Sequence, residues 1–213
     1  MGKVRVAGFG VSIDGFGAGP DQSLEHPLGK RGSEVLNWFF PTQTFRSMIG
    51  KDGGTVGTDN RFARSAMEGF GAFILGRNMF GPAGDDWGGS DWNGWWGDNP
   101  PYHAPTFILT HHARAPIVME GGTTFHFVTD GIEAALAQAK AAAGNLDIKI
   151  GGGVSTVRQY LLERAIDELH LALSPVVLGR GESLFADIDL PSLGYRVTEI
   201  VPTELATHLV LIR

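Results

Sequence analysis

The stretch with the clearest capacity for chemistry lies between residues 147 and 164. A short apolar strand runs into Gly151–Gly153, and a helical pattern of apolar residues begins at Val154. Glycines let a ligand approach the main chain, and the first N–H groups of a helix lack internal partners and form its positive end. We interpret this pattern as a phosphate site, to which Ser155 and Thr156 add hydroxyl donors. A tight strand-to-helix turn without a ligand is the alternative.

Arg77 is a second candidate for binding a phosphate. It follows an apolar strand and Gly76 in the stretch A-F-I-L-G-R-N-M-F. The planar guanidinium group presents a fixed fork of donors that matches phosphate oxygens. An ordinary surface ion pair with an acid is the alternative for this arginine.

Alternating and helical apolar patterns predict the elements that must position these residues. Strands are expected at residues 4–11, 72–75, 106–112, 125–129, 147–150, 168–178, 195–201 and 208–212. Helices are expected after the candidate caps Ser33, Asp59, Asp130 and Gly153, with Glu133 completing a capping box and Gly144 ending the third helix.

Strands and helices alternate up to residue 167, and only strands follow. Alternation predicts parallel strands, whereas consecutive strands joined by short loops predict antiparallel ones. We therefore expect a three-layer α/β/α domain with a mixed, mostly parallel sheet of about eight strands. The last three strands should be antiparallel in part.

Composition narrows the function classes. The 213 residues suit one domain over residues 1–213, and 43% hydrophobic with 19% charged residues is ordinary for a globular protein. A net charge of −6 without a basic run argues against a nucleic-acid partner. The absence of cysteine excludes disulfides, thiol nucleophiles and thiolate metal sites. Glycine, with 31 residues, is about twice its usual ~7% and gathers in loops.

The sequence carries no targeting signal that we can identify. Its first residues lack the apolar run of a signal peptide, and Val6 stands where myristoylation needs Ser or Thr. No segment reaches the roughly 18 apolar residues of a membrane span. We therefore expect a cytoplasmic protein without a membrane partner.

Three motifs in a fixed order resemble a known family. They are G-R-x-x-F at residues 76–80, I-G-G-G at 150–153 and D-E-L-x-L-x-x-x-P-V-x-L-G-x-G at 167–181. Together with the first strand and S-I-D-G, they resemble the dihydrofolate reductase superfamily. More narrowly, the chain is similar to the reductase domain of the bifunctional riboflavin-biosynthesis deaminase-reductase and to its stand-alone relatives. The resemblance is weak only at residues 40–58 and 81–105, and the deaminase half has no counterpart among these residues.

The resemblance implies NADPH lying across the carboxyl edge of the sheet. Its phosphates are expected on the turn after the 72–75 strand and on the helix start after the glycines, with the end of the 106–112 strand, including His112, beside the adenosine 2′-phosphate. The implied cofactor-binding residues are Gly76, Arg77, Asn78, Met79, Thr110, His111, Gly151, Gly152, Gly153, Val154, Ser155 and Thr156. No metal is expected.

The resemblance also implies hydride transfer to a small or heterocyclic substrate with a C=N or C=O bond. Such a reduction needs a proton donor, and Asp14 or Glu34 is the expected acid. The folate pattern P-x-D-L-x-x-F is not met, because Gly32, Glu34 and Val35 replace its first residues. Dihydrofolate should therefore be a poor substrate at best. As alternatives, Asp14 is a turn residue and Glu34 a first-turn helix acid.

Aromatic residues mark two further segments. Trp38 and Phe39 either wall the substrate pocket or fill the core. The loop at residues 85–101 carries four tryptophans, which either cover the pocket as a lid or lie in a dimer interface. Relatives of this kind are often homodimers, so we expect a homodimer. The tryptophans are Trp87, Trp92, Trp95 and Trp96.

Other classes fit less well. A Rossmann oxidoreductase would need a third glycine where Thr156 stands, and further parallel units after it. A protein that binds a nucleotide without catalysis remains the alternative function. Neither a histidine metal hydrolase nor a serine hydrolase is supported, because their spacings H-E-x-x-H and G-x-S-x-G do not occur.

Overall fold

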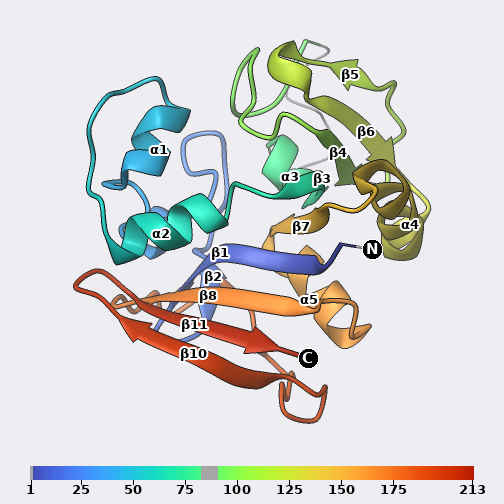
Figure 1. Cartoon of the computed structure of the whole chain (residues 1–213). Coiled ribbons are helices and arrows are strands. Elements are labelled where there is room, and N and C mark those ends of the chain that lie inside the picture. Colours follow the sequence, from blue (N-terminus) through green and yellow to red (C-terminus); the bar gives the residue numbers. More distant parts are fainter. Residues whose placement is uncertain (1, 83–90) are drawn as a thin grey trace.

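The periodic segments assemble into one nine-stranded sheet with helices on both faces in the computed structural model, which describes residues 2–82 and 91–213 (Figure 1). The strands are β1 (Val4–Ser12), β2 (Phe16–Ala18), β3 (Phe70–Gly76), β4 (Pro105–Leu109), β5 (Ile117–Val118), β6 (Thr124–Val128), β7 (Asp147–Gly152), β8 (Glu168–Ser174), β9 (Glu182–Ser183), β10 (Arg196–Pro202) and β11 (Thr207–Ile212). The α-helices are α1 (Gln43–Met48), α2 (Thr58–Ser65), α3 (Arg77–Phe80), α4 (Gly131–Ala143) and α5 (Val154–Leu162), and the 3-10 helices are η1 (Gly32–Leu36) and η2 (Glu120–Gly122).

The sheet is mixed and mostly parallel, as the loss of alternation predicted. Its order is β10-β11-β8-β1-β7-β3-β4-β6-β5, and the six strands from β8 to β6 run parallel. β11 is antiparallel to β8 and β10 is antiparallel to β11, which confirms the expected C-terminal arrangement. The ninth strand is the two-residue edge strand β5, which is too short to leave a periodic signal. β2 and β9 pair separately.

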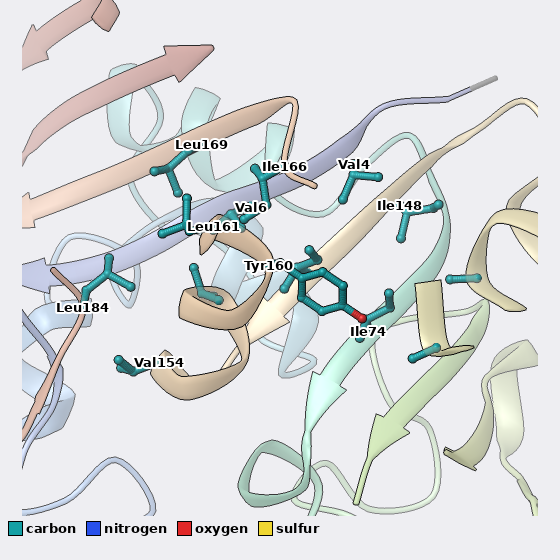
Figure 2. Packing of buried hydrophobic residues seen from close by; sticks show 14 of the residues in the cluster. Val4, Val6, Ile74, Ile148, Val154, Tyr160, Leu161, Ile166, Leu169 and Leu184 are labelled. Carbon is teal, nitrogen blue, oxygen red and sulfur yellow. The ribbon is translucent and has the colours of Figure 1, made fainter. Parts of the chain in front are cut away.

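Side chains alternate between the two faces of the sheet, as the period of two requires. Ile74 packs with α4 and α5, whereas its neighbour Leu75 packs with Phe80 on the opposite face. Figure 2 shows α5 laid on the first face, with Tyr160 and Leu161 among the buried strand residues. This packing fixes the direction of α5 and therefore the place of its first turn.

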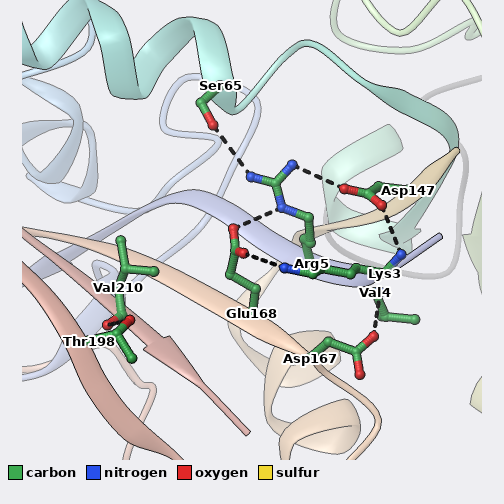
Figure 3. A network of polar contacts seen from close by, with 9 residues as sticks. All are labelled: Lys3, Val4, Arg5, Ser65, Asp147, Asp167, Glu168, Thr198 and Val210. Atoms are coloured by element: carbon green, nitrogen blue, oxygen red, sulfur yellow. Dashed lines mark hydrogen bonds and ion pairs between the residues drawn. The ribbon is translucent and has the colours of Figure 1, made fainter.

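A polar network fixes the edge of the sheet where β1 begins (Figure 3). The Arg5 guanidinium pairs with Asp147 of β7 at 3.3 Å and with Glu168 of β8 at 2.9 Å, and it also donates to Ser65, the last residue of α2. All three charged side chains are largely buried, with 14%, 26% and 20% of their surfaces exposed. One arginine therefore holds β7, β1 and β8 in register with α2.

Several local expectations needed correction. Asp130 precedes α4 but its side chain makes no capping hydrogen bond, so the predicted capping box does not form. Ser33 lies inside the 3-10 helix η1 and does not cap an α-helix over residues 34–40. α2 begins after Gly57, which leaves the Asp59 carboxylate to accept from His208. Propensity patterns do not register such tertiary partners.

None of the helices in the described ranges is long and apolar enough to cross a membrane.

Candidate functional site

A cavity of about 480 Å³ opens at the carboxyl ends of the parallel strands. The ends of β3, β4, β6 and β7 line it, together with the first turns of α3, α4 and α5. Ligands of open parallel sheets bind outside the carboxyl ends of the strands, so this is the expected place for a site. The predicted residues that line it are Gly76, Arg77, Asn78, Met79, Thr110, His111, Gly151, Gly153, Val154, Ser155 and Thr156. Gly152 adjoins them, and a Cβ there would meet Met79 and Phe9, another lining residue.

The glycines differ in what surrounds them. A Cβ at Gly76 would lie 2.4 Å from Thr156 Oγ1, so β3 and α5 touch at this point. A Cβ at Gly153 would meet no atom within 4 Å, although Gly153 lines the cavity and precedes the first residue of α5. The first turn of α5 therefore faces open space that an anion could fill.

The electrostatics of α5 favour that anion. The helix has nine residues, its N-cap Gly153 provides no side-chain cap, and its first turn contains no acid. The first intrahelical bond runs from the Val157 amide to the Gly153 carbonyl. The preceding amides are the ones a helix leaves for an external acceptor, and the helix dipole adds positive potential there.

Arg77, the first residue of α3, lines the same cavity. Its guanidinium donates to the carbonyl of Pro82 and is half-buried. The cavity also takes in His111 and His112 after β4. The structure thus brings the arginine turn, the glycine triplet and the strand end around one space.

The acidic group of the cavity is Glu182 of β9, and the sequence analysis missed it. It is the one carboxylate among the described lining residues. Gln22 donates to it at 3.2 Å, and Asn78 donates to Gln22 at 3.3 Å. Burial raises the pKa of the Glu182 carboxyl. Glu182 directly follows the motif D-E-L-x-L-x-x-x-P-V-x-L-G-x-G, and it reaches the cavity because β9 pairs with β2.

Neither Asp14 nor Glu34 lines the cavity. The Asp14 carboxylate accepts from Ser12 Oγ at 2.6 Å and from the amides of residues 178 and 179, and these bonds, led by Ser12, lower its pKa. Glu34 pairs with Arg31 at 2.8 Å, and this hydrogen-bonded pair lowers the pKa of Glu34. Both acids are held ionised by structural partners, and the structure does not bring them to the predicted site.

These opposite shifts make a measurable prediction. In a carbon-detected NMR titration of the carboxyl groups, Glu182 should titrate above 4.5, Glu34 below 4.5 and Asp14 below 3.8. Glu182 then holds its proton to higher pH than either predicted acid. A Glu182 midpoint at or below that of Glu34 would contradict the burial argument.

The aromatic residues predicted at the substrate pocket lie elsewhere. Trp38 is fully buried against Phe62 and outside the cavity lining, and the half-buried Phe39 packs against it. The core alternative therefore describes their position. Apolar residues of η1, Val35 and Leu36, line the cavity instead.

The described part of the tryptophan loop, residues 91–101, packs beside α3. The Trp92 indole donates to the Phe80 carbonyl at 2.8 Å and the Trp95 indole to the Asn78 carbonyl at 3.2 Å. Trp96 is 39% exposed, and none of these three lines the cavity. Trp87 lies outside the described residues. The described part of the loop supports the turn that carries Arg77.

Comparison with known proteins agrees with this geometry. The profile of the RibD C-terminal domain family matches residues 4–209. The YwjB protein of Bacillus subtilis (strain 168), described as uncharacterized, is 39% identical over 62 residues. That match covers 29% of this chain and 35% of the relative.

Solved structures show the same fold at low sequence identity. A Shewanella sp. PV-4 protein, provisionally named as a riboflavin biosynthesis protein, matches with a TM-score of 0.59 and 21% identity, over 100% of this chain and 99% of that one. Dihydrofolate reductase from Enterococcus faecalis, complexed with NADP(H) and RAB-propyl, matches with a TM-score of 0.54 and 16% identity, over 99% and 96%. The Thermotoga maritima diaminohydroxyphosphoribosylaminopyrimidine deaminase/5-amino-6-(5-phosphoribosylamino)uracil reductase matches with a TM-score of 0.53 and 12% identity. That match covers 99% of this chain and 56% of the other. The dihydrofolate-reductase-like α/β fold is thereby confirmed.

Proposed function

The chain belongs to the RibD C-terminal domain family, and from this premise we propose that it is an NADPH-dependent reductase. The substrate class is a small or heterocyclic compound with a C=N or C=O bond. Family membership supports a reductase-type function. The observation that carries the cofactor proposal is the cavity, which unites an uncapped helix start with an arginine turn at one sheet edge.

The residues around the cavity fit a dinucleotide. The open space at Gly153 and the first-turn amides of α5 suit one phosphate, and Ser155 and Thr156 add hydroxyls. Arg77 lines the same cavity as Thr110 and His111, and its planar guanidinium suits the 2′-phosphate of NADPH. NADPH bound there supplies the hydride. Cavities of ligand sites commonly span about 300–1,000 Å³, which includes this one.

The protein must also provide a proton to the heteroatom that is reduced. Glu182 is suited to this role, because its carboxyl lines the cavity and burial raises its pKa. The Gln22 amide fixes one carboxyl oxygen, which orients the group. After donation the carboxylate recovers its proton from solvent through the open side of the cavity.

The proposal is tested by titrating NADPH and NADH into the protein and following tryptophan fluorescence. Saturable NADPH binding that is stronger than NADH binding is expected. Absence of NADPH binding at millimolar concentration would remove the proposed cofactor.

Replacement of Arg77 by alanine should weaken NADPH binding about 10- to 100-fold, since a charge-assisted bond contributes roughly 1.5–3 kcal/mol. NADH binding should change little, because NADH lacks the 2′-phosphate. The half-buried Arg46 donates to the Asp52 carbonyl and lies outside the cavity lining, so Arg46→Ala is the control variant. Equal losses for both cofactors would place Arg77 at a phosphate they share.

A further inference from the structure

A chain of hydrogen bonds links the cavity to the surface through two buried histidines. The Gly8 amide donates to His170 Nδ1 at 3.0 Å, His170 Nε2 lies 3.0 Å from His208 Nδ1, and His208 Nε2 lies 2.8 Å from Asp59 Oδ1. His170 is 4% exposed and His208 is 0% exposed. We call these four residues the histidine relay.

When both histidines are neutral, all hydrogen bonds of the relay must point the same way, from Gly8 toward Asp59. A backbone N–H can only donate, so His170 Nδ1 must accept and the ring proton must sit on Nε2. His208 Nδ1 then accepts from His170, which places the second ring proton on His208 Nε2, facing the Asp59 carboxylate. Every donor in the chain meets an acceptor.

Aromatic rings enclose the relay. The Phe62 ring stacks on His170 at 4.4 Å and on His208 at 4.1 Å, and Trp38 approaches both rings edge-on. Burial is the main cause that lowers the pKa of each histidine. The charged groups facing the pair are Arg5, Lys149 and Arg61, which favour the neutral forms, and Asp59 and Glu199, which favour a charged His208.

The relay ends at an irregular point of the central strand. β1 shifts register against β8 between Val6 and Phe9, and Gly8 adopts φ +73°. The Gly8 amide lies within this register shift between β1 and β8. Its hydrogen-bond acceptor is the His170 side chain. Gly8, Phe9 and Gly10 all line the cavity.

Phe9 connects this register shift, which we call the β1 bulge, to Gly151–Gly153. A Cβ on Gly152 would lie 3.3 Å from the Phe9 ring, and a Cβ on Gly17 would lie 2.8 Å from it. The ring is therefore packed between β2 and the triplet. Any shift of Gly8 moves a side chain that contacts both walls of the cavity.

We propose that His170 is a positioning residue, which fixes the β1 bulge and Phe9 through the Gly8 amide, and that one proton added to the histidines releases this amide and weakens ligand binding. The inference rests on the proposed function only in its choice of NADP⁺ as the ligand.

The reason lies in the single direction of the relay. A proton added to His208 Nδ1 faces the proton on His170 Nε2, and the two repel. Moving the His170 proton to Nδ1 relieves that contact but sets it against the Gly8 N–H. In both cases one hydrogen bond of the relay is lost. The bond from the Gly8 amide is the one that breaks, because it involves a neutral backbone group, whereas the bond to Asp59 involves a charged carboxylate.

The test compares wild type with His170→Asn and His170→Leu between pH 7.5 and 4, a range that extends below pH 5 because burial lowers the pKa of both histidines. Asparagine keeps an acceptor near the position of Nδ1 but does not titrate, whereas leucine removes the acceptor. NADP⁺ affinity is measured together with the Gly8 and Phe9 amide resonances and the histidine tautomers by ¹⁵N NMR. His126→Asn is the matched control, since His126 is half-buried on β6 and lies outside the relay.

Wild type should lose about tenfold more NADP⁺ affinity than His170→Asn on acidification, because loss of one buried hydrogen bond has that magnitude. His170→Leu should bind weakly at both pH values, and His126→Asn should follow wild type. Protonation of the cofactor's own phosphate affects every variant, so parallel losses in wild type and His170→Asn would overturn the proposal.

The NMR measurements test the hydrogen bonds of the relay without any ligand. At pH 7.5 both histidines should carry their proton on Nε2, and the Gly8 and Phe9 resonances should move together as the histidines titrate. A proton on His170 Nδ1 at pH 7.5, or unmoved Gly8 and Phe9 resonances, would refute the relay. Failure of NADP⁺ to bind any variant would contradict the proposed function and leave this NMR result to decide the relay.

Discussion

Replacing Gly153 by alanine and then by valine should weaken NADPH binding stepwise, by at least about 100-fold for valine, with little loss of stability. An added Cβ would lie more than 4 Å from every residue other than its chain neighbours. They block access to the first amides of α5, and two lost charge-assisted bonds of roughly 1.5–3 kcal/mol each account for that factor. Fluorescence titration and thermal unfolding measure the two quantities.

Gly76→Ala is the matched control, because Gly76 lines the same cavity with nearly the same φ, −71° against −69° at Gly153. Its Cβ would lie 2.4 Å from Thr156 Oγ1, so overpacking should lower the free energy of unfolding by about 1–3 kcal/mol. The Gly153 variants should therefore lose NADPH affinity with little loss of stability, whereas Gly76→Ala should also lose stability. Unchanged NADPH affinity in Gly153→Val would show that the ligand avoids α5.

The free energy of unfolding should fall as the pH is lowered from 6.5 to 5. As pH falls below about 6.5, histidines in the unfolded chain bind protons, whereas His170 and His208 resist protonation in the fold because burial lowers their pKa. The unfolded state then binds more protons, so stability falls as pH falls. The slope is about 1.4 kcal/mol per pH unit for each histidine that stays neutral. For His170 alone this amounts to about 2 kcal/mol between pH 6.5 and 5.

Urea unfolding at constant ionic strength over this range measures the slope. His170→Phe should be less stable than wild type at pH 7, because the Gly8 amide loses its acceptor, yet it should lose less stability on acidification. A wild-type stability that does not change between pH 6.5 and 5 would show that both histidines are already free to protonate in the folded protein.

The strand and helix framework was predictable because its signals are local. The alternating apolar residues of the parallel strands and the stripe of α5 are read within a few positions, and they placed Gly153 and Arg77 at one edge of the sheet. Parallel strands bring their carboxyl ends together whatever the loops between them do. The phosphate side of the candidate site followed from this geometry.

The carboxyl group of the candidate site could not be predicted from local sequence patterns. Asp14 lies close to the sheet edge in sequence, but hydrogen bonds from the loop at residues 178–179 turn its carboxylate away. Glu182 reaches the cavity because β9 pairs with β2, and Ala18 and Glu182 are far apart in the chain. Both outcomes depend on loop pairing, which leaves no periodic trace in the sequence. The histidines escaped notice for the same reason, since β8 and β11 bring them together only in the sheet.

The place of β1 in the sheet affects how the protein folds during its synthesis on the ribosome. β1 precedes the other described strands in the chain but lies between β7 and β8 (Figure 1), and Arg5 meets its partners Asp147 and Glu168 only 142 and 163 positions later. Contacts so distant in sequence slow folding, because the chain must close long loops before they form. A nascent chain that ends before β8 therefore holds its central strand with an unpaired edge, and a chaperone has its longest opportunity to bind there. Once β8, β10 and β11 have left the ribosome, a protease-sensitive nascent chain should become resistant in a single late step.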